Sequence, residues 1–249
     1  MTLRSKADFA EMKALGRLVG RAVELLRHSA RPGITTAELD EIGAAFLRKE
    51  GCRSAPQVFY GFPGFNCISV NEEIVHGIPG PRVLAPSDVV KLDVTAERGG
   101  YVADAAVTVV LPPGTAAARA LIGCARAAFG KALAIARAGL PVAELGRAVE
   151  TEVKGCGFAV LRELSGHGVG RAIHEAPSVP NFYSAMTRGA LEDGMVIALE
   201  PIVSAKPASA VHESDGWTIR TSNRSLAAHH EHTIVITEGA PEILTTAAA

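Results

Sequence analysis

Five side chains of metal-binding type occur at separate points along this chain of 249 residues: Asp93, Asp104, His167, Glu200 and Glu231. Four are carboxylates and one is an imidazole, a donor set that suits a pair of divalent metal ions. Paired metal ions activate water for the hydrolysis of amide or phosphate ester bonds. The residue types therefore predict a two-metal hydrolase.

The first two candidate ligands lie on the two strands of a predicted β-hairpin. Strand-forming residues lie on both sides of Arg98-Gly99-Gly100, which indicates a tight turn. With a two-residue turn at Arg98-Gly99, Asp93 lies directly opposite Asp104, and their Cβ atoms are about 5 Å apart. Two like charges at this distance are destabilising unless a cation lies between them. A solvent-exposed hairpin with unrelated acids is the alternative.

The surroundings of the other three candidates leave alternatives open. His167 lies between glycines that let the backbone approach a ligand closely. A phosphate-binding loop is disfavoured there because no Walker lysine follows, and an ordinary core histidine is the other alternative. Glu200 adjoins an apolar strand, where an unpaired carboxylate is costly to bury. Glu231 has histidines on both sides, so a surface histidine cluster is possible.

The elements that must carry these residues read as two helix pairs, each followed by strands. Apolar residues recur at helical spacing over residues 8–27, and Thr35 with Glu38 predicts a capping box for a helix that ends near Lys49. A second pair begins with an alanine-rich helix over residues 116–137. Helix pairs and antiparallel strands together predict an α+β fold. We expect the helices to cover one face of a curved sheet and the ligands to lie on the other.

A short repeat indicates how the chain is organised. The sequence Ala-Glu-Leu occurs at residues 37–39 and again at 143–145, at the same place in each helix pair. We interpret the chain as a single catalytic domain, residues 1–249, with related halves of about 8–113 and 114–245. Chance similarity between two helices of common composition is the alternative.

Composition excludes several classes of partner. The formal net charge is −1, so charge predicts neither DNA nor a membrane as a partner. The four cysteines form no C-x-x-C pair and indicate reduced thiols in a cytoplasmic protein. The first residues lack the apolar run of a signal peptide, and no stretch is long and apolar enough to predict a transmembrane helix.

Taken together, these features resemble the type I methionine aminopeptidases, peptidases of the creatinase-like "pita-bread" fold. The likeness runs from about Leu3 to Thr245 and rests on the segments RPGITTAELD, GFPGFNCISVNEEIVHGIP, KLDVTAERGGYVAD, SGHGVGRAIHEAP, ALEPIV and RSLAAHHEHTIVIT. The resemblance implies a fold of two pseudo-symmetric halves. It also implies removal of the N-terminal methionine from nascent proteins and peptides.

The resemblance implies a role for each ligand. Asp93 would chelate one of two divalent metal ions (Co, Mn, Fe or Zn), and Asp104 and Glu231 would bridge both. His167 and Glu200 would hold the second ion. A hydroxide activated by the dinuclear metal centre would attack the amide, and Glu200 would also transfer protons.

The resemblance also implies groups that bind the substrate. His76 and His174 would contact the scissile amide and stabilise the tetrahedral intermediate, although each alone reads as an ordinary loop histidine. The positions that match the methionine pocket are Phe59, Phe62, Cys67 and Trp217. Aromatic rings and a thiol suit a thioether side chain, and ordinary core packing is the alternative.

Some positions depart from the usual family pattern: Lys91, Val102, Ala105, Ile173 and His229. Lys91 replaces a common asparagine, His229 replaces a common glutamine, and Ala105 lacks the hydroxyl of a common threonine. These changes remove no ligand. They leave open the rate, the substrate range and the physiological metal, and whether the protein is a housekeeping enzyme or a specialised second copy.

Three alternative functions are compatible with parts of the sequence. An Xaa-Pro-type peptidase of the same fold is disfavoured because such relatives usually carry a long additional N-terminal domain. A non-catalytic homologue that binds a ribosome or protein is disfavoured because all five ligands are present. A two-metal phosphatase or nuclease is disfavoured by the lack of a basic patch around the motifs. The expected partner is a peptide or nascent chain with N-terminal methionine. We expect a monomer, and the stripe of Lys13, Arg17 and Arg21 allows a transient ribosome contact.

Overall fold

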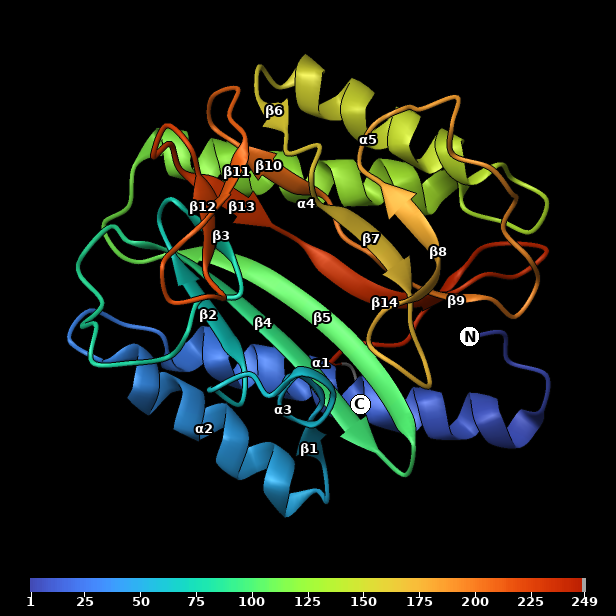
Figure 1. Cartoon of the computed structure of the whole chain (residues 1–249), viewed down its shortest axis with the longest axis horizontal. Coiled ribbons are helices and arrows are strands. Elements are labelled where there is room, and N and C mark those ends of the chain that lie inside the picture. Colours follow the sequence, from blue (N-terminus) through green and yellow to red (C-terminus); the bar gives the residue numbers. More distant parts are fainter. Residues whose placement is uncertain (248–249) are drawn as a thin grey trace.

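The computed structural model describes residues 1–247, and in it each of two helix pairs packs against one half of a curved arrangement of antiparallel strands (Figure 1). The first pair is α1 (Lys6–Ser29) and α2 (Thr36–Lys49), and the second is α4 (Ala116–Ile135) and α5 (Val142–Gly155). A short helix, α3 (Ala55–Tyr60), lies beside the sheet. All four long helices were predicted from the sequence.

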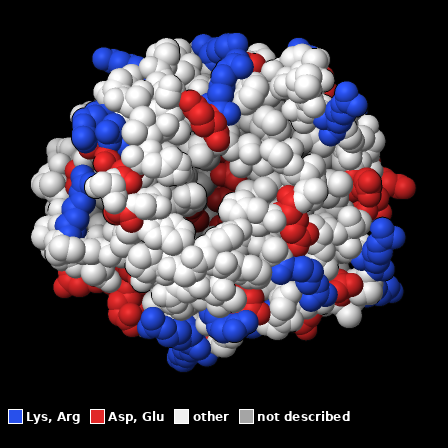
Figure 2. Space-filling model, in the orientation of Figure 1, with Lys and Arg blue, Asp and Glu red and all other residues white. Residues whose placement is uncertain are grey.

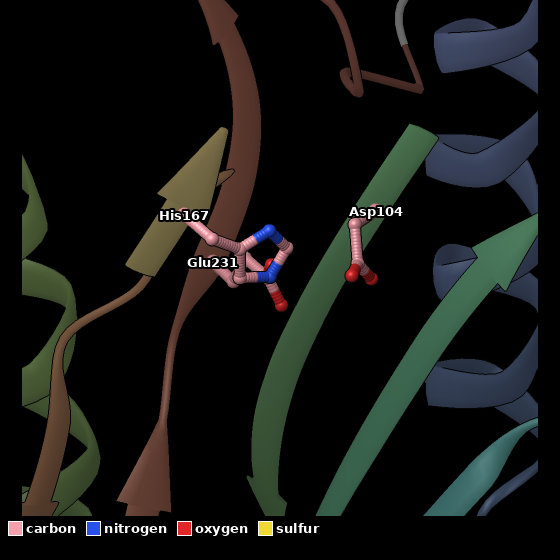
Figure 3. A group of neighbouring side chains, drawn as sticks. All are labelled: Asp104, His167 and Glu231. Atoms are coloured by element: carbon pink, nitrogen blue, oxygen red, sulfur yellow. The ribbon is translucent and has the colours of Figure 1, made fainter. Parts of the chain in front are cut away.

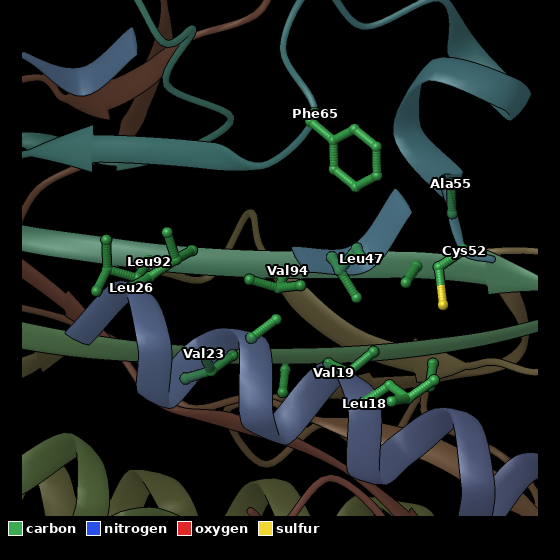
Figure 4. Packing of buried hydrophobic residues seen from close by; sticks show 14 of the residues in the cluster. Leu18, Val19, Val23, Leu26, Leu47, Cys52, Ala55, Phe65, Leu92 and Val94 are labelled. Carbon is green, nitrogen blue, oxygen red and sulfur yellow. The ribbon is translucent and has the colours of Figure 1, made fainter. Parts of the chain in front are cut away.

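Helix α1 packs its apolar face against the long hairpin of β4 (Val89–Arg98) and β5 (Tyr101–Val110). Its buried residues recur every three or four positions, so they form one stripe: Met12, Leu15, Val19, Val23 and Leu26. Figure 4 shows three of them below Leu92 and Val94 of β4. Alternate residues of β4 therefore face α1, while Asp93 between them points to the other side of the sheet.

The predicted capping box closes the first turn of α2. The backbone N–H of Glu38 donates to Thr35 Oγ1 at 3.1 Å, and the backbone N–H of Thr35 donates to Glu38 Oε2 at 2.8 Å. The hydrogen bonds from Thr35 also hold the pKa of the Glu38 carboxyl below its ordinary value.

Replacing Thr35 with alanine is expected to lower the free energy of unfolding by about 1 kcal/mol. The N–H of Glu38 would lose its acceptor at the helix end. Thr35→Ser keeps the hydroxyl and should retain most of the stability. Urea denaturation of both variants tests this, and equal stability of Thr35→Ala and the wild type would contradict it.

The second helix pair covers the other half of the sheet system. Helices α2 and α5 each contain 14 residues, but α5 begins after Pro141 with no side-chain cap, whereas Thr35 caps α2. Helix α4 ends at Ile135, two residues before the predicted end. The division into related halves stays a prediction.

The main sheet has nine strands, ordered β1-β4-β5-β14-β9-β7-β8, with β2 paired to β4 and β15 to β14. Its other strands are β1 (Arg53–Ser54), β2 (Cys67–Val70), β7 (Ser165–Gly168), β8 (Glu175–Pro180), β9 (Val196–Leu199), β14 (Glu231–Val235) and β15 (Glu242–Ile243). Two three-stranded sheets flank it, ordered β13-β10-β6 and β11-β12-β3. Their strands are β3 (Glu73–Val75), β6 (Ala159–Val160), β10 (Ile202–Ser204), β11 (Ala210–His212), β12 (Ile219–Thr221) and β13 (Ala227–His229).

The predicted hairpin is present, but its predicted register is wrong. Arg98 pairs with Tyr101, so the turn is Gly99-Gly100, and Asp104 faces Thr95 rather than Asp93. Both glycines have positive φ, 60° and 80°, as the central residues of a tight hairpin turn require. An arginine would be strained at the first of these positions. Asp93 is two residues from Thr95 and so still shares the sheet face of Asp104.

None of the helices within residues 1–247 combines the length and the hydropathy that a bilayer-spanning segment needs.

Candidate metal centre

A cavity of about 270 Å³ contains the predicted site. Ten of the eleven predicted site residues line it: Phe62, Cys67, His76, Asp93, Asp104, His167, His174, Glu200, Trp217 and Glu231. Figure 2 shows acidic atoms at the bottom of a hollow near the centre of this face, within a mostly uncharged surface. The volume lies just below the usual range of ligand pockets, roughly 300–1,000 Å³, so the cavity suits one small group or residue.

Neighbouring strands bring the metal-type ligands together. Asp104 lies on β5, Glu231 begins the adjacent β14, and Glu200 follows β9. His167 lies on β7, the strand beyond β9. Figure 3 shows the side chains of Asp104, His167 and Glu231 directed toward one another, and one ligand atom of each lies within 4.8 Å of the others. Residues more than sixty positions apart thus form one cluster.

The buried carboxylates of this cluster have no lysine or arginine in the cavity lining to balance their negative charge. Burial raises the pKa of Asp104 to about 7. Burial and the nearby carboxylates raise the pKa values of Asp93, Glu200 and Glu231 well above their ordinary values. The cavity lining includes no lysine or arginine, and Glu231 Oε1 has no hydrogen-bond partner within residues 1–247. Four such carboxylates and an imidazole fit divalent metal ions, which would supply the missing positive charge.

His167 is oriented as a metal ligand. Its Nδ1 lies 3.0 Å from the carbonyl oxygen of Gly168, so we assign the proton to Nδ1. Its Nε2 then presents a lone pair toward the cluster and lies 3.4 Å from Glu200 Oε1. Burial lowers the pKa of His167 to about 4, so the ring is neutral at pH 7, the form that binds metals.

A hydroxyl that sequence reasoning missed fixes one carboxylate. Thr95 Oγ1 donates to Asp104 Oδ1 at 2.8 Å. The Asp104 backbone is also held, because its N–H donates to Thr233 Oγ1 at 2.9 Å. Thr95 faces Asp104 across the hairpin, so the correct register would have identified it. Ala105 removes one hydroxyl from the family pattern, but the Asp104 carboxylate keeps another.

Two histidines line the cavity near the ligands. Burial lowers the pKa of His76 to about 4 and also lowers the pKa of His174, so both are neutral at pH 7. The Nδ1 atom of His174 lies 2.8 Å from the hydroxyl oxygen of Tyr60, and its ring centroid lies 4.3 Å from that of His167. A neutral imidazole can donate a hydrogen bond to a substrate oxygen.

The apolar wall differs from its prediction at one residue. The structure does not bring Phe59 to the cavity: its side chain is 39% exposed, and the next residue, Tyr60, lines the cavity instead. Both lie on α3, where adjacent side chains point about 100° apart. The rings of Phe62 and Trp217 pack edge to face with centroids 5.3 Å apart. Cys67 is paired with Asp93 between β2 and β4.

The positions that depart from the family pattern have three kinds of surroundings. Ile173 and His229 line the cavity. Val102 and Ala105 belong to the apolar core that includes α1. Lys91 is buried, which lowers its pKa to about 7, and its Nζ donates to the carbonyl oxygen of Asn71 at 2.7 Å.

Comparisons with known proteins identify the family. The sequence profile described as metallopeptidase family M24 matches residues 10–238. The chain is 42% identical over 247 residues to methionine aminopeptidase 2 of Bacillus subtilis strain 168, covering 98% of this chain and 99% of that protein. It is 36% identical to the methionine aminopeptidase of Borreliella burgdorferi over 245 residues, 98% of each.

Comparison with solved structures agrees with this family assignment. A methionine aminopeptidase from Thermotoga maritima superimposes with a TM-score of 0.95 at 34% identity, over 99% of this chain and 100% of that one. The prolidase from Pyrococcus furiosus superimposes with a TM-score of 0.79 at 20% identity, over all of this chain and 66% of that one, which shows a shared fold alone. The chain belongs to metallopeptidase family M24, and it has the pita-bread fold that its sequence predicted.

Proposed function

We propose that this protein is a metalloaminopeptidase that removes the N-terminal methionine from peptides and nascent proteins. The observation that carries the proposal is the buried cluster of four carboxylates and an imidazole beneath a small cavity with aromatic walls. The full-length similarity to proteins named methionine aminopeptidase supports it. The membership of family M24 makes the chain a metallopeptidase.

Two divalent metal ions would occupy the cluster. Asp93, Asp104 and Glu231 would hold one ion, and Asp104, Glu231, His167 and Glu200 would hold the other. When bound, such ions lower the pKa of water so that it becomes a nucleophile near neutral pH, and they polarise the scissile carbonyl. The identity of the ions, among Co, Mn, Fe and Zn, is set by geometry and by supply in the cell.

The protein's own side chains would transfer protons and stabilise charge. Glu200 is buried beside His167 and would carry a proton between the attacking water and the leaving amine. His76 and His174 are neutral and line the same cavity, so each can donate a hydrogen bond to the oxygen of the tetrahedral intermediate. The hydroxyl of Tyr60 fixes the ring of His174.

The apolar wall would select methionine. The rings of Phe62 and Trp217 provide the faces and edges that attract a thioether. Burial raises the pKa of the Cys67 thiol well above its ordinary value, so it stays neutral and behaves as an apolar group. We leave Phe59 out of this pocket because its side chain does not line the cavity.

Replacing Trp217 with alanine is expected to lower kcat/KM for Met-Ala-Ser by about 10- to 100-fold, through a higher KM, because the methionine side chain loses an aromatic contact. Tyr183→Ala is the matched control, since Tyr183 packs on Arg147 and does not line the cavity. Steady-state kinetics of both variants test the role. An unchanged kcat/KM for Trp217→Ala would remove this residue from the pocket.

The proposal extends to a cytoplasmic, monomeric protein with one catalytic domain. Two cations of the basic stripe have partners within the chain: Lys13 pairs with Glu242, and Arg21 lies over the ring of Phe46. A ribosome contact therefore stays a prediction that rests on Arg17 and its surroundings.

A peptide panel separates the proposed function from its rivals. Release of methionine from Met-Ala-Ser, with little cleavage of an Ala-Pro peptide or of p-nitrophenyl phosphate, is the expected result. Preferential cleavage of Ala-Pro would favour an Xaa-Pro peptidase. Cleavage of the phosphate ester alone would favour a phosphatase. Failure on all three substrates with every metal would contradict the enzyme assignment.

A further inference from the structure

His229 is a buried histidine in the cavity wall whose ring nitrogens make no hydrogen bond within the described residues. It ends β13, its side chain is 2% exposed, and it lines the same cavity as Glu200 and Glu231. Within residues 1–247, neither Nδ1 nor Nε2 has a hydrogen-bond partner. A buried imidazole with no partner for either nitrogen is costly.

The backbone of His229 is held rigidly by a neighbouring strand. Its N–H donates to Thr108 Oγ1 at 2.8 Å, and the same hydroxyl donates to the His229 carbonyl oxygen at 2.7 Å. Thr108 lies on β5, the strand that carries Asp104. The main chain at His229 is therefore fixed by two buried hydrogen bonds, and neither of them uses a ring nitrogen.

The distances from His229 match those between ligands of one metal ion. Its Nε2 lies 3.3 Å from Glu200 Oε2 and 3.4 Å from Glu231 Oε2. Hydrogen bonds between nitrogen and oxygen are usually shorter, about 2.7–3.2 Å. Adjacent ligand atoms about 2.1 Å from one cation lie about 3.0 Å apart in octahedral geometry and about 3.4 Å apart in tetrahedral geometry, and they spread further where the coordination is irregular. These three residues also offer ligand atoms that all lie within 4.8 Å of one another.

We propose that His229 is an additional ligand of the metal centre and that its Nε2 binds an ion shared with Glu200 and Glu231. The inference rests on the proposed metal centre and adds a residue to it. Glu200 presents one oxygen to His229 and the other to His167, so the carboxylate lies between two imidazoles.

A second imidazole changes which ions the centre prefers. Nitrogen ligands suit Zn²⁺, Co²⁺ and Fe²⁺, whereas Mn²⁺ is well served by oxygen alone. We therefore expect His229 to strengthen the binding of Zn²⁺ and Co²⁺ more than that of Mn²⁺. His229→Gln removes the imidazole and keeps a polar side chain of similar reach.

X-ray absorption at the zinc edge of the Zn²⁺-loaded protein tests this directly. The imidazole scattering, scaled by the zinc content of the sample, should account for both His167 and His229 in the wild type and for His167 alone in His229→Gln. His230→Gln is the matched control, because the ring of His230 packs on Phe129, with centroids 5.2 Å apart. Wild-type scattering that accounts for one imidazole would overturn the proposal, even if the variant failed to fold.

Chelator competition gives the second readout. His229→Gln is expected to weaken Zn²⁺ and Co²⁺ binding at least about 10-fold and Mn²⁺ binding much less, while His230→Gln changes neither. An equal loss for all three ions would indicate a merely structural role and would overturn the proposal. Neither readout uses peptide cleavage. A protein that binds zinc through both histidines but releases no methionine would refute the proposed function and leave this inference standing.

Discussion

Glu200→Gln is expected to lower kcat/KM for methionine release from Met-Ala-Ser by about 10³-fold or more. The amide of glutamine is nearly the same shape, but it cannot accept or return a proton and is a poorer metal ligand. The main chain at this position should stay in place, because the side chain of Asn181 donates to the Glu200 carbonyl oxygen at 2.9 Å. The loss would therefore reflect chemistry at the carboxylate.

The control for this variant is Glu192→Gln. Glu192 is an exposed carboxylate that precedes β9 and does not line the cavity. It should retain the wild-type rate, and thermal unfolding should show that both variants fold. A Glu200→Gln variant with more than about a tenth of wild-type activity would contradict the proton-transfer role.

Asp104→Asn is expected to stabilise the metal-free protein at pH 7.5 by on the order of a few kcal/mol. Burial raises the pKa of Asp104 from 3.8 to about 7 in the folded protein. Above pH 7 the folded state must keep a buried charge that the unfolded state solvates easily, so ionisation destabilises the fold. Asparagine removes this cost. Below about pH 4 the carboxyl is protonated in both states and the cost disappears.

The advantage of Asp104→Asn should therefore shrink by more than about half between pH 7.5 and pH 5. With saturating metal the order should reverse, because the wild type gains binding energy that the variant largely loses. Urea denaturation with chelator and then with metal measures both effects. A variant that is less stable than the wild type in chelator at pH 7.5 would contradict the account of the carboxylate cluster.

The sequence allowed most of the fold to be predicted because its signals are local. The apolar stripe of α1 and the capping box of Thr35 and Glu38 depend on residues three or four positions apart. The chemical types of Asp104 and His167 likewise identified them as candidate metal ligands, and the structure brings these two side chains together.

The parts that could not be predicted depend on where a side chain points rather than on its chemical type. The hairpin register shifted because Gly99-Gly100, rather than Arg98-Gly99, forms the turn, and this hid the contact of Thr95 with Asp104. Phe59 and Tyr60 are adjacent aromatic residues on one short helix, and only the packing of α3 decides which one reaches the cavity.

His229 shows a further limit. From the sequence it was one of several histidines beside Glu231, and its replacement of a common glutamine did not indicate which way its side chain points. In the fold, it points at two carboxylates, whereas the ring of His230 packs on Phe129. The pairing of β13 with β10, which aligns His229 with Ile202, is a long-range contact with no signal in the flanking residues.

The most direct test of the account is methionine release from Met-Ala-Ser by protein stripped of metal, before and after addition of Mn²⁺, Co²⁺, Fe²⁺ or Zn²⁺. We predict no release from the stripped protein and restored release with at least one ion. Release of methionine that continues in chelator, from protein shown to contain no metal, would contradict the claim that this cluster of carboxylates works by holding divalent ions.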